Sequence, residues 1–405
     1  MIRRALSSLL TRILLAIVLG ALCGLFFPEP LARVFTTFNG LFSNFLGFLV
    51  PVLILALVAP AIADLGRGAG KWLLITAVVA YASTILAGLL AFGTAMSLFP
   101  TLLAGESESG GLIDPSELSL TPFFAVEMPP PFEIMTALLL AFGIGVGITV
   151  VKGRVLHKGL EELRDIVMLI VLRIVIPLLP IYVFGSFLGL TMNGQIGVVI
   201  TSFLKVVIVA FLLTVVMLIV QYTAAGLIAR KNPFVLLKNM LPAYFTALGT
   251  ASSAATIPVT LAATRRNGVS EEVAGFTVPL CATIHLAGST VKIVLFSLAV
   301  MMLVGQQIEP VAYIGFILML GITMVAAPGV PGGAIMAAVG ILQSLLGFDE
   351  TMISIMIATY VAIDSVGTAT NVTGDGAIAV AIDRFYRKSG AGHDDAALSP
   401  QPQTA

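Results

Sequence analysis

Long apolar runs dominate the chain and recur at intervals that fit membrane-spanning helices. Six of them precede residue 230, and each is roughly 20 residues long or longer, which an α-helix needs to cross a ~30 Å hydrocarbon core. The pattern therefore predicts an all-α integral membrane protein. We expect these six helices at residues 11–27, 40–63, 72–100, 134–151, 164–192 and 196–229.

Small and polar residues interrupt the apolar segments after residue 230. TASSAATIP occupies Thr250 to Pro258, and AAPGVPGGA occupies Ala326 to Ala334. Proline and paired glycines break helical hydrogen bonding, and the freed backbone groups must be satisfied by protein, ions or a polar cavity. We therefore expect two re-entrant helical hairpins, at about 233–265 and about 310–347, and two kinked transmembrane helices are the alternative.

A polar stripe marks the last apolar segment, which we expect to be one helix at about 351–383. Its members follow the first at spacings of four, seven and eleven residues: Asp364, Thr368, Asn371 and Asp375. At about 100° per residue they share one face of the helix. Because a carboxylate in hydrocarbon is costly unless it is partnered, the stripe indicates a functional site. Polar contacts that hold helices together are the alternative.

Composition and charge agree with a membrane protein. The chain is 58% hydrophobic and 10% charged, with a mean hydropathy of +1.07. Lysine and arginine balance aspartate and glutamate at 21 each, so charge gives no indication of a nucleic-acid partner. The loop from Thr101 to Glu133 carries six carboxylates and no Lys or Arg. If the helices alternate in direction, the basic residues of the other connections lie on the same side of the membrane as the N-terminus. The positive-inside tendency then places both termini in the cytoplasm and this loop outside the cytoplasmic membrane.

The sequence contains few motifs that would indicate an enzyme. The chain lacks HExxH and a phosphate-binding glycine loop followed by Lys-Ser/Thr, and no nucleophile stands beside a positioned base. Asp364 and Asp375 invite comparison with an aspartyl protease, but on one helix they would lie about 16 Å apart, too far to share a proton. A passive channel remains an alternative to a carrier.

Five segments, taken together and in order, resemble the glutamate-transporter family, the dicarboxylate/amino acid:cation symporters. They are LVPVLILALVAPAIADLG (Leu49 to Gly66), ASSAATIPVT at the first hairpin, PLCATIHLAGST (Pro279 to Thr290), GVPGGAIM at the second hairpin, and NVTGD. The similarity extends over about residues 10–385. Where the family typically has the sequence PLGATINMDGT, an alanine here replaces the aspartate. The sequence of these segments resembles the serine/threonine-transporting branch more than the glutamate branch.

The resemblance implies a glutamate-transporter-like fold of eight transmembrane helices and two re-entrant hairpins, assembled as a homotrimer in the lipid bilayer. A static scaffold would hold a transport domain that moves like an elevator. The implied divisions are 1–71 (scaffold helices one and two), 72–100 (transport helix three), 101–133 (external loop), 134–192 (scaffold helices four and five), and 193–385 (transport domain, with helix seven at about 272–304). Residues 386–405 would form a cytoplasmic tail, and their composition predicts disorder.

Roles at the site also follow from the resemblance. The implied substrate-binding residues are Ser252, Ser253, Gly329, Val330, Gly332, Asp364, Gly367, Thr368 and Asn371. Asp364 would pair with the substrate ammonium, and Thr368 and Asn371 would bond its main-chain groups. The two serines would bind the α-carboxylate through hydroxyl and N–H donors, and the glycine-rich segment would be the lid.

Two departures from the family bear on the substrate. Acidic-amino-acid members carry an arginine where this chain has Gly367, and the arginine that the first hairpin sometimes supplies is replaced by Ala251. Without either arginine, the acidic side chain of a substrate would be buried unpaired, which favours small neutral amino acids such as serine, threonine or alanine. The alternative is that Lys292 takes the part of the arginine, which would admit a dicarboxylate or an acidic amino acid.

The cation ligands are altered too. Asn371 and Asp375 match the ligands of one sodium site, and the region of Thr283 is a candidate for another, because Na⁺ prefers oxygen ligands. The family's NMD triplet reads His285, Leu286, Ala287, so one sodium site is expected to be lost. We expect no resident cofactor, and Na⁺ or H⁺ as the coupling ion.

His285 and Lys292 stand seven residues apart, so on a continuous helix they would share one face. We hypothesise that Lys292 reaches Asp375 and substitutes for a bound cation, or that His285 titrates and couples transport to protons. The alternative is that Lys292 snorkels toward the membrane surface and His285 donates one structural hydrogen bond.

Overall fold

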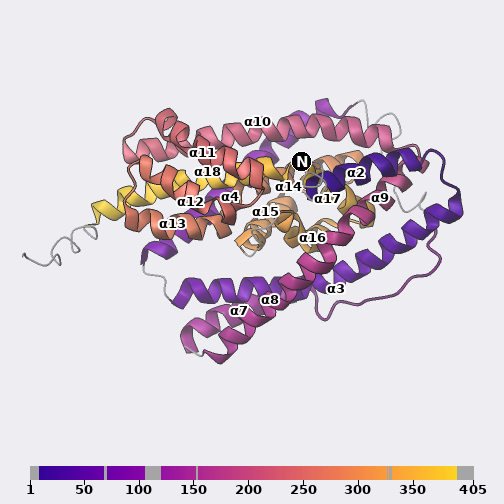
Figure 1. The fold of residues 1–405 in the computed structure, drawn as a ribbon, viewed down its shortest axis with the longest axis horizontal. Coiled ribbons are helices and arrows are strands. Elements are labelled where there is room, and N and C mark those ends of the chain that lie inside the picture. Colours follow the sequence, from indigo (N-terminus) through magenta and orange to yellow (C-terminus); the bar gives the residue numbers. More distant parts are fainter. Residues whose placement is uncertain are drawn as a thin grey trace, which may run out of the picture.

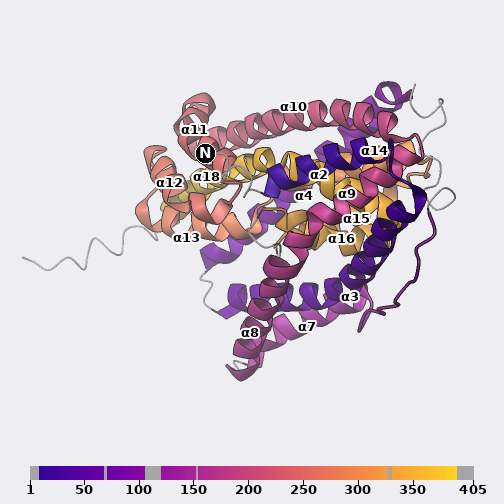
Figure 2. The same ribbon diagram turned by 45° about the vertical axis from the view of Figure 1, so that its right-hand side comes forward.

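The computed structural model describes residues 9–67, 71–104, 120–151, 154–325, 327 and 331–389, and every regular element in these ranges is helical. The helices are drawn in Figures 1 and 2. In chain order they are α2 (Leu9–Cys23), α3 (Glu29–Arg67), α4 (Lys71–Leu102), α7 (Ile134–Val151), α8 (Val155–Ile170), the π-helical turn η1 (Val171–Val175), α9 (Ile176–Met192), α10 (Ile196–Ala229), α11 (Pro233–Thr250), α12 (Ser253–Arg266), α13 (Glu271–Ile284), α14 (Ala287–Leu303), α15 (Pro310–Val325), α16 (Gly333–Leu346), α17 (Glu350–Ala362) and α18 (Asp364–Lys388).

The length and apolar character of these helices confirm a multi-span membrane protein. Among the described residues, five segments are long and apolar enough to cross a bilayer, and the bent pair α17–α18 would make a sixth. The five are Glu29–Ala63, Lys71–Leu102, Val155–Met192, Ile196–Ala229 and Glu271–Leu303. Helix α2 and helices α15 and α16 are apolar but shorter, with 15, 16 and 14 residues.

Two helix pairs occupy the segments expected to be hairpins. Helices α11 and α12 contact each other, and the chain turns between them at Ala251, whose φ of 49° lies in the left-handed region. Helices α15 and α16 also contact each other, and Gly332, with φ of 75°, precedes α16. At the second turn Pro331 and Gly332 precede α16, as the sequence indicates, whereas Pro258 lies inside α12 and the first turn is formed by Ala251 and Ser252.

Two segments that the sequence predicts as continuous helices are broken. The expected helix at 272–304 is divided between α13 and α14 at His285 and Leu286. The expected helix at 351–383 is divided at Ile363, where α17 and α18 meet at 63°. Both predictions of a continuous helix are therefore wrong. Side chains from other helices bind the backbone at each break, Asn371 at the N–H of Gly288 and Lys292 at the carbonyl of Ile363, and these contacts offset the helical hydrogen bonds lost there.

The helices form two groups by their contacts. The outer group contains α2, α3, α7, α8, η1 and α9, and the core group contains α4 and α10 to α18. Helix α18 lies inside the core group and packs against α10, α11, α12, α13 and α14. Contacts between the groups come mainly from α15 and α16 against α3, and from α17 against α2 and α9.

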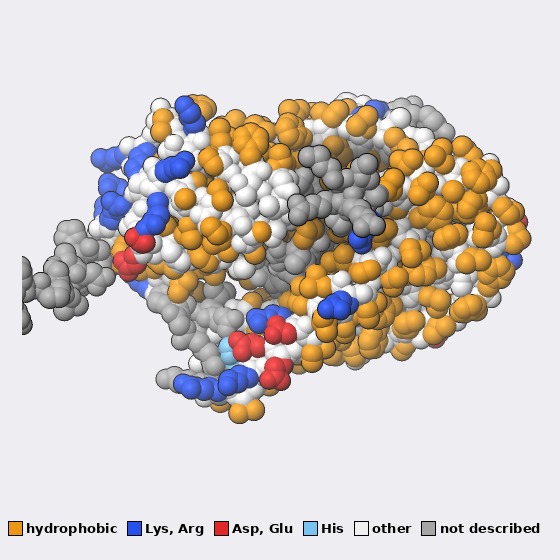
Figure 3. All heavy atoms as spheres, viewed as in Figure 1, with side chains coloured by type: hydrophobic (Ala, Val, Ile, Leu, Met, Phe, Trp, Pro, Cys, Tyr) orange, Lys and Arg blue, Asp and Glu red, His pale blue; other side chains and the backbone are white. Residues whose placement is uncertain are grey.

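Lysine and arginine gather at the end of the core group where α10, α12 and α18 end and α11 and α13 begin, at the left in Figure 3. The exposed basic residues there are Arg230, Lys231, Lys238, Arg265, Arg266, Arg384, Arg387 and Lys388. By contrast, α10 exposes large apolar side chains along its length, including Leu204 at 61% and Leu212 at 58%. An apolar exposed face of this length fits contact with lipid chains.

Candidate functional site

The carboxylate of Asp364 is the centre of the first polar cluster. Asp364 is the first residue of α18, directly after the break at Ile363, and it is buried. Its Oδ2 accepts the backbone N–H of Gly332 at 2.7 Å, and its Oδ1 lies 3.3 Å from Nζ of Lys292. The turn before α16, the start of α18 and the middle of α14 therefore meet at one carboxylate.

Lys292 is fully buried, with 0% of its side chain exposed. Its Nζ also donates to the carbonyls of Ile363 at 3.3 Å and Asp364 at 3.5 Å, and lies 3.8 Å from the centre of the Tyr360 ring. The carbonyl of Ile363 is available because the helix is broken there. A buried ammonium is tolerated only with such partners.

The absence of a side chain at Gly367 makes room for this lysine. A Cβ at position 367 would lie 2.4 Å from Cε and 2.6 Å from Nζ of Lys292. Lys292 thus reaches the position where acidic-substrate relatives were expected to carry their arginine. Its ammonium is nevertheless paired with Asp364.

The hypothesis that Lys292 pairs with Asp375 is wrong, and so is the alternative that Lys292 snorkels. Both assumed one continuous helix for residues 272–304. Because the chain is extended at His285, with φ of −102° and ψ of 96°, His285 and Lys292 lie on opposite sides of the break and face different carboxylates.

Asp375 forms the second cluster, together with His285. Nδ1 of His285 lies 2.9 Å from Oδ1 of Asp375, and both side chains are at most 1% exposed. Nε2 of His285 lies 3.1 Å from Oγ of Ser83 and 3.2 Å from Nε2 of Gln221. With the Gln221 amide oriented in this way, its N–H points at the ring, so Nε2 accepts and Nδ1–H donates to Asp375.

The resemblance implies a coupling cation, and two oxygens beside His285 fit one. Oδ2 of Asp375 and Oε1 of Gln221 are buried and have no hydrogen-bond partner among the described residues. Unpartnered buried oxygens, one of them on a carboxylate, are the ligands that a hard cation prefers. Asp375 would therefore hold the ion, with Gln221 as a second candidate ligand.

Asn371 lies between the two clusters and caps a helix. Its Oδ1 accepts the N–H groups of Gly288 at 2.8 Å and Ser289 at 3.3 Å, at the start of α14. Its Nδ2 donates to Oγ of Ser289 at 3.1 Å, and this hydroxyl also accepts the phenol of Tyr360 at 2.9 Å. Asn371 therefore satisfies N–H groups that the break before α14 leaves without intrahelical partners.

The other predicted site residues lie nearby or outside the described structure. Oγ1 of Thr368 bonds the carbonyl of Asp364 at 3.1 Å within α18. Ser252 is the N-cap of α12 and accepts the N–H of Ala255 at 3.3 Å, and Ser253 is buried at the start of that helix. Helix α12 packs on α18, and the bond between Ser252 and Ala255 lies at the start of α12 itself.

Thr283 was predicted as a sodium ligand, and Gly329 and Val330 were predicted as part of the lid. Thr283 is exposed, and its hydroxyl bonds the carbonyl of Leu280 at 2.7 Å on its own helix, α13. Gly329 and Val330 lie outside the described residues, as do residues 390–405 of the predicted tail and residues 105–119 of the predicted external loop.

Sequence reasoning missed four polar side chains that complete the clusters. They are Ser83 on α4, Gln221 on α10, Ser289 on α14 and Tyr360 on α17. Gln221 was detectable, because an amide in the apolar run of α10 needs partners inside a membrane.

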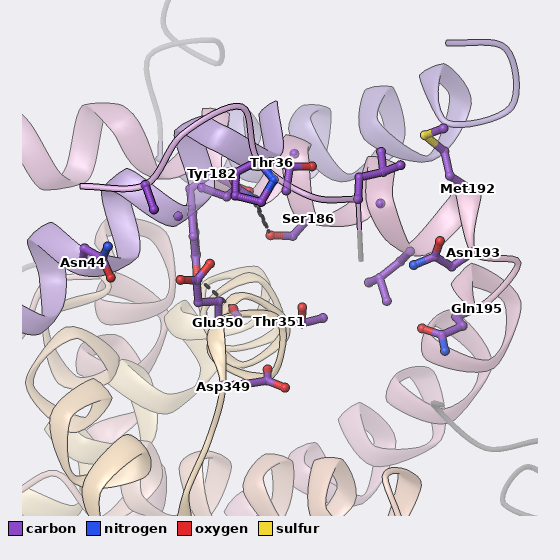
Figure 4. A pocket seen from close by; sticks show the side chains of 18 of the residues that line it. Thr36, Asn44, Tyr182, Ser186, Met192, Asn193, Gln195, Asp349, Glu350 and Thr351 are labelled. Atoms are coloured by element: carbon purple, nitrogen blue, oxygen red, sulfur yellow. Dashed lines mark hydrogen bonds between the residues drawn. The ribbon is translucent and has the colours of Figure 1, made fainter. Parts of the chain in front are cut away.

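A separate cavity of about 360 Å³ opens between α3, α9 and the start of α17 (Figure 4). Its lining includes Asn39, Tyr182, Ser186, Asp349 and Glu350, and it shares no lining residue with the two clusters. The hydroxyl of Tyr182 donates to the carbonyl of Glu350 at 2.8 Å. This cavity therefore lies at a contact between the outer and core groups.

Comparison with known proteins identifies a family that the sequence matches. The model of the Sodium:dicarboxylate symporter family matches residues 9–385. Serine/threonine transporters named SstT, from Acinetobacter baumannii strains ATCC 17978, AYE and SDF, are each 27% identical over 393 residues. The match covers 94% of this chain and 98% of each relative.

Proposed function

Because the chain belongs to the sodium:dicarboxylate symporter family, a family of transporters and not of enzymes, we propose that it carries a small neutral amino acid across the cytoplasmic membrane. Serine, threonine and alanine are the substrates of the expected size. A sodium or proton gradient would drive uptake. Cation coupling itself follows from the family.

The charge balance around Gly367 carries the proposal. A substrate with a carboxylate side chain needs a cation that is free to pair with it. The cation beside Gly367 is Lys292, and its ammonium is engaged by Asp364 and two main-chain carbonyls. A zwitterion without a further charge needs no such cation, and relatives at 27% identity are named serine/threonine transporters.

The binding mode that fits this geometry uses both clusters. The substrate ammonium would approach Asp364, and N–H and hydroxyl donors at the start of α12, with Ser252 and Ser253, would bind its carboxylate. The turn at Gly332, already bonded to Asp364 at 2.7 Å, would close over it. The coupling ion would bind at Asp375.

The movement proposed for the cycle is an elevator. The outer group would form the static scaffold and the core group the transport domain, within a fold of eight transmembrane helices and two re-entrant hairpins. The exposed basic residues where α11 begins and where α12 and α18 end favour a cytoplasmic position for that end of the core group and for both termini. A homotrimer is part of the same proposal.

A dicarboxylate or an acidic amino acid is the second candidate. The observation in its favour is the closeness of Lys292 to position 367, where a Cβ would lie 2.6 Å from Nζ. For this substrate Lys292 would have to leave Asp364 and grip the side-chain carboxylate. With a dicarboxylate, which has no ammonium, Asp364 would then lose its cation. An acidic amino acid would bring its own ammonium to Asp364, and it is the weaker candidate because the relatives are named serine/threonine transporters.

An uptake panel in proteoliposomes tests the proposal. Radiolabelled serine, threonine, alanine, aspartate and succinate are offered under an imposed sodium gradient, an imposed proton gradient, or neither. We expect concentrative uptake of the neutral amino acids under one of the gradients and its loss in Asp364→Asn. Preference for aspartate or succinate would overturn the proposed substrate, and uptake that ignores both gradients would indicate a channel.

A further inference from the structure

Both carboxylate oxygens of Asp364 are engaged by groups of this chain. Oδ2 accepts the N–H of Gly332 at 2.7 Å, and Oδ1 lies 3.3 Å from Nζ of Lys292. The proposed function assigns the same carboxylate to the substrate ammonium. Lys292 and the substrate therefore compete for one acceptor, Oδ1 of Asp364.

Lys292 remains in the site when it gives up that acceptor. Its Nζ keeps the carbonyls of Ile363 at 3.3 Å and Asp364 at 3.5 Å, and the face of the Tyr360 ring at 3.8 Å. These partners belong to the broken end of α17 and the start of α18, so they move with Asp364. Exchange between Lys292 and a substrate ammonium therefore changes one contact and moves no charge out of the site.

A buried carboxylate without a partner cation is strongly destabilising. Asp364 therefore needs a cation each time the transport domain crosses the membrane. An elevator that accumulates its substrate crosses twice per cycle, once loaded and once unloaded. On the loaded passage the substrate ammonium partners Asp364. On the unloaded passage some other cation has to do so, and Lys292 is within reach of the same oxygen.

We propose that Lys292 is a tethered counter-cation that neutralises Asp364 while the unloaded transport domain returns. The residue would take the place of a soluble cation on that step. This inference rests on the proposed function, because it needs a carrier with a substrate ammonium on Asp364. It adds that the return step depends on a side chain of this chain.

Two modes of L-serine transport separate the unloaded return from the loaded passage. Net uptake into serine-free proteoliposomes requires the unloaded return, whereas exchange of labelled for unlabelled serine at equal concentrations does not. In Lys292→Met we expect net uptake to fall at least about tenfold, because Asp364 is left unpaired, and exchange to fall by no more than about threefold. The control is Lys205→Met on α10, whose Nζ bonds the carbonyl of Leu102 at 3.2 Å, and neither mode should change.

A second variant guards against a folding defect in Lys292→Met. Lys292→Arg keeps a cation beside Asp364, so its net uptake should lie closer to that of the wild type than to that of Lys292→Met. An equal fall in both modes in Lys292→Met, net uptake in Lys292→Arg as low as in Lys292→Met, or undiminished net uptake in Lys292→Met would overturn the inference.

The proposed function can fail separately. Wild-type protein that neither accumulates nor exchanges any amino acid of the panel would remove the function and, with it, the role of Lys292. Wild-type protein that does both, alongside variants that lose both modes equally, would remove only the role of Lys292.

Discussion

His285 donates its Nδ1–H to Oδ1 of Asp375 across 2.9 Å, in a part of the core group where both side chains are at most 1% exposed. The histidine can do so because the chain is extended at that residue and the helix ends at Ile284. Ser83 and Gln221 lie on the other side of the ring, at 3.1 Å and 3.2 Å from Nε2. A buried carboxylate is thereby held by one donor, and its second oxygen is left for a cation.

Removing the imidazole should therefore destabilise the protein strongly. His285→Ala leaves Asp375 buried without its donor, at a cost of about 3 kcal/mol, whereas Ser83→Ala removes one neutral hydrogen bond, worth about 1 kcal/mol. Thermal unfolding in detergent should show the larger drop in midpoint for His285→Ala.

A double-mutant cycle provides the control for that comparison. If His285 acts through Asp375, the variant with both His285→Ala and Asp375→Asn should be more stable than the sum of the single losses predicts, because the stranded charge is gone. Additive losses would show that the two side chains are not energetically coupled.

The sequence predicted where most helical segments lie but not all of their bounds: the segment expected at 40–63 lies within α3, which begins at Glu29, and the helix expected at 11–27 ends at Cys23. Residues 196–229, expected to be one helix, are α10 without a shift, because an unbroken apolar run has one low-energy form in a membrane. The breaks at Ile363 and at His285 were not predicted. Neither position carries a proline, and each break depends on partners from other helices, which periodicity does not show.

The sequence also could not predict which charged side chains pair, because the pairing depends on contacts between different helices. The stripe from Asp364 to Asp375 identified the two carboxylates, and the unusual His285 and Lys292 identified two partners. Which partner meets which acid depends on the turn between α13 and α14. Once the chain is extended there, His285 faces Asp375 and Lys292 faces Asp364.

Asn371 should tolerate aspartate better than leucine. Its Oδ1 accepts two N–H groups at the start of α14, and a carboxylate oxygen can take that place, with added benefit from the helix dipole. Asn371→Leu loses the cap and buries two donors unpaired, at a cost of about 2–4 kcal/mol. We expect Asn371→Leu to lower the thermal midpoint further than Asn371→Asp, and the reverse order would argue against the capping role.

Gly288 should be intolerant of any side chain. A Cβ there would lie 2.7 Å from the carbonyl oxygen of Gly367 and 2.7 Å from Cβ of Thr370, so α14 and α18 would have to separate. The matched control is Gly315 on α15, where a Cβ meets nothing within 4 Å. Gly288→Ala should destabilise by about 1–3 kcal/mol, the range of overpacking, while Gly315→Ala should be neutral or stabilising, since alanine favours helix. Equal thermal midpoints for the two variants would contradict the close approach of α14 and α18.

The bond between Tyr182 and Glu350 should help to hold the two helix groups in the arrangement seen here. The hydroxyl of Tyr182, on α9, donates to the carbonyl of Glu350 at the start of α17, across 2.8 Å. Tyr182→Phe removes this bond and the contact of the same hydroxyl with Ser43 on α3, which lies within the outer group and does not join the two groups. The loss is about 1 kcal/mol, which shifts an equilibrium between two arrangements about fivefold.

Spin labels at two exposed positions, Val155 on α8 and Arg266 on α12, would report the change. With the native Cys23 and Cys281 replaced by serine and alanine, the distance distribution in Tyr182→Phe should gain a second population. Tyr81→Phe is the control, because its hydroxyl also bonds a carbonyl, that of Leu318 at 3.2 Å, but within the core group. Loss of that bond leaves contacts between the groups intact, so its distribution should match the parent. A second population in both variants, or in neither, would show that the Tyr182 hydroxyl does not fix the relative position of the two groups.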